Sequence, residues 1–273
     1  MFVTIITDCS DANASARQVT RYESYLGVPA FLVGVSMPTT NLDVLPGFGE
    51  LETATNLIDI LDGAEGGRGI AIANVAPRQG QGKHWPNGTP FGYFLYKQTL
   101  VIATIDGYVL SLVKKLGLTD HIKVFDIPTV VDAMIKLGYL EEKKRDLIVK
   151  SQFRSFEFVP RVAKWLTEGI DVPHEIYDIS KVADAPKCIS YVDNFGNTVT
   201  TMLPEDIGFV AGKEITTKFG TFKCYDRMKD VPNGETAFII GSWGIEDKRW
   251  VAFIIQGQSA AKKYNLSPGT ELF

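Results

Sequence analysis

The sequence has no excess of basic residues, few cysteines and no long apolar run, and each absence excludes a class of protein. Its 28 Lys and Arg against 32 Asp and Glu give a net charge of -4, which lacks the basic surface that a nucleic-acid binder needs. The 3 scattered cysteines provide neither a disulfide framework nor a zinc pattern. No apolar run is long enough to cross a membrane, and the first residues lead into Asp8 without the basic start of a signal peptide. We therefore expect a cytoplasmic protein with no nucleic-acid, membrane or metal partner.

The chain is long enough for a large core, and its first part alternates strand-like and helix-like segments. With 273 residues, 45% of them hydrophobic, it has the size of two domains. Runs rich in Val, Ile and Phe predict strands, and apolar residues at three-to-four spacing predict helices. The predicted strands are residues 2–7, 30–35, 69–75, 100–105 and 122–125, and the predicted helices are 12–26, 50–61, 108–116 and 130–137. This alternation predicts an α/β domain with a mostly parallel sheet over residues 1–166.

The pattern changes in the second half of the chain. Residues 167–186 are polar and contain Gly169, Pro173 and Pro186, so we expect a linker there. Beyond it, short apolar runs alternate with Gly- or Asn-containing turns, which predicts a smaller, mostly-β domain over residues 187–273. Its predicted strands are residues 188–192, 198–203, 237–241 and 250–255.

An acid-rich turn follows the first predicted strand. Open parallel sheets bind ligands beyond the carboxyl ends of their strands, which is where Asp8 falls. An ionised carboxylate there suits a ribose diol, because two neighbouring hydroxyls can each donate to one of its oxygens. Asp11 in the same turn has two interpretations, as a ligand-binding acid or as the N-cap of the helix that follows.

A second turn, residues 193–197, combines an acid, an aromatic ring, a glycine and an amide between two strand-like runs. This composition is typical of a small-molecule binding turn. The alternative is a tight turn in which Asp193 and Asn197 bond to the local backbone.

The glycine-rich stretch after the third predicted strand, residues 77–83, is not a nucleotide-binding motif. It has neither the Walker spacing nor the dinucleotide fingerprint, despite the presence of Lys83. We interpret it as a substrate loop or a plain surface loop.

The order of motifs along nearly the whole chain resembles the S-adenosylmethionine hydroxide adenosyltransferase, chlorinase and fluorinase superfamily. The motifs are Thr7-Asp8, residues 52–59, the loop at Pro77, Asp106-Gly107, residues 153–157, Asp193 with residues 195–197, and residues 257–261. The segment 250–269 follows the family pattern without a gap and is the most specific part.

The resemblance implies a homotrimer in which an N-terminal α/β domain is joined to a C-terminal β-barrel. In that family, S-adenosylmethionine lies between one subunit's first domain and its neighbour's second domain, so the resemblance implies that it is the substrate rather than a cofactor. The implied reaction is displacement of methionine at the ribose C5′ carbon by water or halide.

The resemblance also implies roles for individual residues. The predicted substrate-binding residues are Asp8, Asp11, Asp193, Phe195, Asn197, Ser242, Ile255 and Gly257. Asp11 and Phe195 are included for their place in the two turns, and the resemblance implies the other six. Asp8 corresponds to the ribose carboxylate, and the acid, amide and hydroxyl side chains of the second domain correspond to ligands of the methionine or adenine end. The backbone at Ile255 and Gly257 corresponds to the adenine contacts.

The sequence departs from the hydrolase pattern at the implied catalytic positions. The expected Asp, Arg and His fall on Ala76, Lys83 and Arg154. Lys83 supplies charge without the planar fork of arginine, and Arg154 can orient an anion but cannot take a proton from water. Ser155 with Glu157 is closer to the fluorinase version of the motif.

Three functions therefore stay open. The first is hydrolysis of S-adenosylmethionine to adenosine and L-methionine, with the catalytic set Lys83, Arg154 and Ser155 holding the water. The second is halide-dependent adenosyl transfer, suggested by Ser155 and Glu157. The third is non-catalytic binding of adenosine or S-adenosylmethionine, suggested by the changed catalytic positions.

Overall fold

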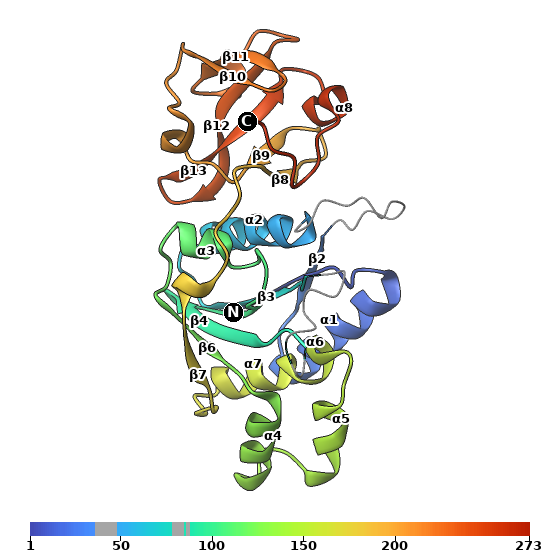
Figure 1. Cartoon of the computed structure of the whole chain (residues 1–273). Helices are drawn as coiled ribbons and strands as arrows, with labels where there is room; N and C mark the ends of the chain where they lie inside the picture. Colours follow the sequence, from blue (N-terminus) through green and yellow to red (C-terminus); the bar gives the residue numbers. More distant parts are fainter. Residues whose placement is uncertain (36–47, 78–84, 86–87) are drawn as a thin grey trace.

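The computed structural model of the chain describes residues 1–35, 48–77, 85 and 88–273 and contains two β-sheets joined through helices (Figure 1). The first sheet has the strand order β2-β1-β3-β5-β4-β6-β7. Its strands are β1 (Phe2–Thr7), β2 (Phe31–Gly34), β3 (Gly69–Asn74), β4 (Phe91–Tyr96), β5 (Thr99–Thr104), β6 (His121–Val124) and β7 (Glu175–Asp178). Strands β2, β1, β3 and β5 pair in parallel, whereas β4 pairs antiparallel with both β5 and β6, and β7 pairs antiparallel with β6. The predicted α/β class with a mostly parallel sheet is confirmed.

Helices cover both faces of this sheet (Figure 1). One face carries α1 (Ala12–Leu26), α4 (Ile127–Lys136), α5 (Arg145–Val149), α6 (Arg154–Glu157) and α7 (Val159–Thr167), and the other carries α2 (Phe48–Gly63) and α3 (Ser111–Lys115). Short 3-10 helices lie at Glu142–Lys144, Ile179–Lys181, Pro204–Ile207 and Met228–Asp230. Helix α1 has the predicted bounds because Asp11 caps its start and Gly27, with φ of 67°, ends it in the left-handed region.

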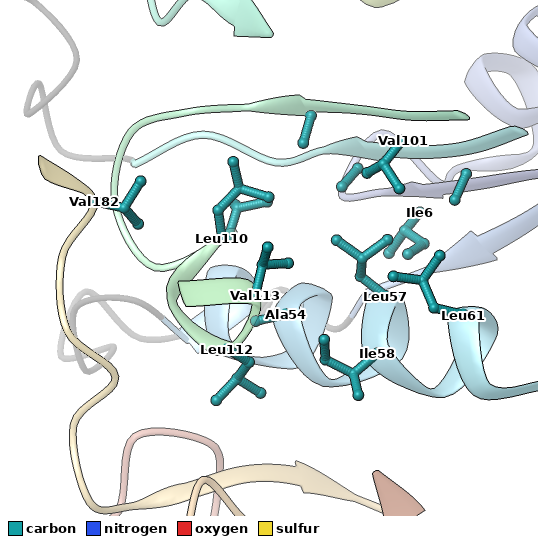
Figure 2. Packing of buried hydrophobic residues seen from close by; sticks show 14 of the residues in the cluster. Ile6, Ala54, Leu57, Ile58, Leu61, Val101, Leu110, Leu112, Val113 and Val182 are labelled. Atoms are coloured by element: carbon teal, nitrogen blue, oxygen red, sulfur yellow. The ribbon is translucent and has the colours of Figure 1, made fainter. Parts of the chain in front are cut away.

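Alternation along the strands gives the sheet two apolar faces. Val3 and Ile5 of β1 pack on the side of α1, α4 and α7, whereas Ile6 packs on the side of α2 and α3. On that second side, Leu57 and Leu61 of α2 lie against Ile6 and Val101 (Figure 2).

The second sheet is mostly antiparallel and has the order β10-β11-β12-β13-β9-β8. Its strands are β8 (Ile189–Val192), β9 (Thr198–Thr200), β10 (Glu214–Thr217), β11 (Gly220–Tyr225), β12 (Thr236–Ile245) and β13 (Lys248–Ile255), followed by α8 (Ala260–Tyr264). The implied barrel is not closed strand to strand, since β10 and β8 are the edges of an open sheet. The chain end crosses this opening: the Ile189 N–H donates to the Thr270 carbonyl at one edge, and the Lys218 N–H donates to the Leu272 carbonyl beside the other.

Helix α2 lies between the two sheets and bonds to the second one (Figure 1). The Thr55 hydroxyl donates to the Ser190 hydroxyl at 2.7 Å, and the Gly244 N–H donates to the Asp59 carboxylate at 2.8 Å. Arg249 pairs with Asp62 at 2.8 Å. Burial raises the pKa of Asp59 to about 7. The apolar cluster around α2 also includes Val199 and Trp250, so the core continues from one sheet to the other.

Several elements differ from the sequence prediction. Strand β7 and the 3-10 helix at Ile179–Lys181 occupy part of the stretch 167–186 that we expected to be a linker, because β7 completes the edge of the first sheet beside β6. Strand β4 and the β10–β11 hairpin were not predicted. No helix in the described part of the chain combines the length and apolarity that crossing a bilayer requires.

Candidate functional site

The carboxyl ends of β1, β3 and β5 bring polar side chains to one edge of the first sheet. The Asn74 side-chain amide at the end of β3 donates to the Thr7 hydroxyl oxygen at 3.0 Å, and the same oxygen accepts the Cys9 N–H at 3.1 Å. On β5, the Thr104 hydroxyl donates to the Val75 carbonyl. These bonds fix the strand ends relative to one another and give the turn after β1 a defined start.

Asp8 lies at this edge because it directly follows the last residue of β1, as the sequence predicts. The Cys9 thiol lies 3.6 Å from its Oδ1 atom. Gln18 of α1 fixes this turn to the helix. It is fully buried, and its side-chain amide donates to the Cys9 carbonyl at 3.0 Å. Binding of a ribose by Asp8 stays a prediction.

Asp11 caps α1. Its Oδ1 atom accepts the N–H groups of Asn13 and Ala14, each at 3.0 Å. Of the two interpretations of Asp11, the structure shows the N-cap, and contact with a substrate stays a prediction.

A buried acid next to this edge was missed from the sequence. Glu50, at the start of α2, is only 6% exposed and accepts the Tyr108 N–H at 2.8 Å. Burial raises the pKa of its carboxyl, and the nearby charge of Asp106 raises it further. Asp106 accepts the Trp85 indole N–H at 3.0 Å. The sequence marks the Asp106-Gly107 turn, but nothing local indicates that a glutamate from α2 packs against it.

Arg154 and Ser155, predicted to act together, face different surroundings. The guanidinium of Arg154 donates to the Thr89 carbonyl at 2.8 Å, lies over the Phe91 ring and borders an open pocket of about 270 Å³. Burial lowers its pKa. Ser155 is 3% exposed, and its carbonyl accepts the Tyr22 hydroxyl at 3.1 Å.

The remaining members of these motifs are structurally engaged or lie outside the description. Glu157 accepts from Arg21 and Arg161, both at 3.1 Å. Ala76 is half-buried and carries no ionisable group. Lys83 lies outside the described residues, so its predicted role is not addressed by the structure.

The turn of residues 193–197 forms a closed hydrogen-bond network. Asp193 accepts the Phe195 N–H and the Asn197 N–H through Oδ1, both at 2.9 Å, and the Asn197 amide through Oδ2 at 2.8 Å. Asn197 is buried, whereas the Phe195 ring is 73% exposed. The acid and amide therefore shape the turn, as the alternative interpretation predicts, and they present an aromatic ring to solvent.

This turn lies beside the segment 255–261, so the structure brings two separate motifs of the second domain together. The Ala261 N–H donates to the Gly196 carbonyl at 3.0 Å. Ile255 is buried, and its carbonyl accepts the Gln258 N–H at 3.1 Å, while Gly257 between them has φ of 77°. Ser242 lies on the exposed part of β12, with its carbonyl bonded to Arg249 at 3.1 Å.

The chain thus consists of an α/β domain followed by a β domain, and the β domain resembles a known family. Residues 187–273 match the model of the SAM hydroxide adenosyltransferase C-terminal domain. This match covers the second sheet, the turn of residues 193–197 and the segment 255–261. No curated protein matches the chain.

Two solved structures share the fold over almost the full length. An uncharacterized conserved protein from Thermotoga maritima has a TM-score of 0.64 and 12% identity, with 98% of each chain covered. A conserved hypothetical protein from Thermus thermophilus has a TM-score of 0.58 and 15% identity, with 100% of each chain covered. At these identities the likeness shows a common fold.

Proposed function

We propose that this protein binds S-adenosylmethionine and cleaves it at the ribose C5′ carbon with water, giving adenosine and L-methionine. The observation that carries the proposal is the match of residues 187–273 to the C-terminal domain of the S-adenosylmethionine hydroxide adenosyltransferases. The α/β domain supports it by placing Asp8 at the carboxyl end of β1, where open sheets bind ligands. S-adenosylmethionine is a substrate in this proposal, and no cofactor takes part.

This substitution needs no covalent intermediate with the protein. Sulfonium is a good leaving group, and its charge disappears as the C5′–S bond breaks, so alignment and desolvation of the attacking nucleophile dominate the rate. Asp8 would hold the ribose diol in this scheme, while the backbone at Ile255 and Gly257 would bind adenine. The catalytic set Lys83, Arg154 and Ser155 remains part of the proposal, with Arg154 available as an orienting charge and not as a base.

We further propose that the site is completed by a second copy of the chain, in a homotrimer. The Phe195 ring supports this idea, because a turn that is rigidly bonded within its own domain leaves a large apolar ring 73% exposed. A neighbouring subunit or a bound adenosyl group would cover such a ring.

The test is incubation with S-adenosylmethionine followed by mass spectrometry of all adenosyl products, with chloride and fluoride present in parallel samples. Adenosine and methionine in equal amounts are expected, whereas a halogenated nucleoside would replace water by halide as the nucleophile. Asp8→Asn should abolish binding and turnover, since an amide cannot accept both diol protons. Asp132→Asn, at an exposed ion pair with Arg145, is the matched control. Full affinity in Asp8→Asn would refute the site.

A non-catalytic binder is the second candidate, and the side chains at two implied catalytic positions favour it. Ala76 and Arg154 offer no group that can take a proton from water. Calorimetry that shows saturable binding of S-adenosylmethionine, without any product after a long incubation, would select this function over hydrolysis.

A further inference from the structure

A pocket of about 270 Å³ lies at the edge of the first sheet where β4, β6 and β7 meet, and we call it the Arg154 pocket. Its apolar wall includes Trp85, Phe125 and Ile127, and its charged groups are Arg154, Asp126 and Glu175. The pocket contains none of the residues that the resemblance assigns to S-adenosylmethionine apart from Arg154. Its volume is slightly below the range of typical drug-sized ligand sites, so it suits a small metabolite.

Arg154 brings an uncompensated positive charge to this pocket. Its guanidinium has five N–H donors, and the contacts with described residues are one bond to the Thr89 carbonyl and stacking over Phe91. It forms no ion pair within the described part of the chain. A partly buried guanidinium without a counter-ion is unfavourable, and its planar fork matches a carboxylate.

Glu175 brings an opposite charge to the same pocket. It is the first residue of β7, is exposed, and pairs in register with Val124 of β6. Val124 of β6 pairs in register with Gly92 of β4 and with Glu175 of β7, so the backbones of Gly92 and Glu175 lie two strand spacings apart, roughly 10 Å. Glu175 forms no ion pair with a described residue, Arg154 included. Both charged residues therefore line one pocket without forming an ion pair with each other.

Asp126 adds a second acid but is already engaged. Its Oδ2 atom accepts the N–H and hydroxyl of Thr129 at 3.0 and 2.6 Å, as the N-cap of α4. The pocket thus combines a cation, two acids and an apolar wall. The wall contains the buried Phe125, which stacks on Tyr93 at 5.2 Å between ring centroids.

We propose that the Arg154 pocket binds an α-amino acid with an apolar side chain. The ligand carboxylate pairs with Arg154, the ammonium group faces Glu175 and Asp126, and the side chain packs against Trp85, Phe125 and Ile127. A simple anion fits less well, because Asp126 and Glu175, which line the same pocket, would repel it. A purely apolar ligand would leave the guanidinium unpaired. The assignment does not depend on cleavage of S-adenosylmethionine.

The experiment is calorimetric titration of the full chain with L-leucine, 4-methylpentanoate and 3-methylbutylamine. The two analogues keep the branched side chain but lack the ammonium group and the carboxylate, respectively. Leucine should bind saturably and at least about tenfold more tightly than either analogue, since each loses a charge-assisted contact. L-phenylalanine in the same series reports how large a side chain the apolar wall admits. Absence of saturation with both amino acids, or equal affinity for leucine and an analogue, would overturn the proposal.

Variants separate the pocket from the site at Asp8. Glu175→Gln changes an exposed residue without a structural bond and should weaken leucine, but not 4-methylpentanoate, by about tenfold. Glu205→Gln, an exposed acid of the second domain, is the matched control and should leave the affinity unchanged. Arg154→Met should abolish binding, and if it fails to fold, the Glu175 variant still decides. Asp8→Asn should keep leucine affinity whether or not S-adenosylmethionine binds. Loss of leucine binding in that variant would place the ligand in the other site and refute the assignment.

Discussion

Asp59 is expected to make the stability of the protein depend on pH near neutrality. It sits on α2 and accepts the Gly244 N–H of β12 at 2.8 Å, so it joins the two sheets. Burial disfavours its charged form and raises its pKa from 3.8 to about 7. Asp59→Asn keeps an oxygen that accepts the same hydrogen bond but removes the charge. The variant therefore isolates the cost of ionising this carboxyl between the sheets.

The sign and size follow from proton linkage. Because the folded-state pKa is raised, the folded protein binds the Asp59 proton more tightly than the unfolded chain does. The stabilisation that the protonated Asp59 contributes is fully present below the ordinary pKa of 3.8. It is lost as the pH rises to the folded-state pKa of about 7. One pKa unit is worth about 1.4 kcal/mol, so the loss between about pH 5.5 and pH 8 is about 2 kcal/mol.

The measurement is urea denaturation of the wild-type protein and Asp59→Asn at several pH values between these limits. The stability advantage of the variant should grow by about 2 kcal/mol from the lower to the higher pH and then level off. Asp247→Asn, in the exposed turn between β12 and β13, is the control and should follow the wild type. A constant difference between Asp59→Asn and the wild type across the series would show that the Asp59 carboxyl is already ionised, and the reasoning would fail.

Two further predictions concern the first domain. Asp11→Ala should lower the free energy of unfolding by about 1 kcal/mol through loss of the α1 cap while keeping the affinity for S-adenosylmethionine, and a calorimetric loss of affinity at unchanged stability would contradict the capping role. Gly107→Ala should destabilise the protein by about 1 to 3 kcal/mol, because φ is 68° and the new Cβ would stand 1.9 Å from the Glu50 Oε2 atom. Gly117→Ala, with φ of 63° and open space around it, measures the backbone strain alone, and an equal loss in both variants would show that Glu50 moves aside freely.

Elements with a strong local signal could be predicted from the sequence. Strand β1 and helix α1 have the predicted bounds, because an apolar run, a capping acid and a terminating glycine lie together in the chain. Strand β4 was missed, since its place between β5 and β6 depends on antiparallel pairing with both, which no local pattern shows. The same holds for β7, whose polar sequence is ordered by its pairing with β6.

The candidate site divides in the same way. The location of Asp8 follows from the end of a strand, which the sequence indicates directly. Glu50 could not be predicted, because its burial depends on the packing of α2 against the Asp106-Gly107 turn, more than fifty residues further along the chain. One of the two interpretations of the 193–197 turn predicted that its acid and amide bond within the turn. The structure shows this, because the Asn197 side-chain amide donates to the Asp193 carboxylate.

The apolar cluster around α2 has a consequence for how the chain loses its structure. Leu57 on the helix, Ile6 on the first sheet and Trp250 on the second belong to one continuous buried group. Neither sheet can separate from α2 without exposing to water the tryptophan and leucine surface that is buried between them. Heating or denaturant should therefore unfold both domains in a single cooperative transition. A fragment of residues 187–273 alone would expose an apolar surface and would tend to self-associate.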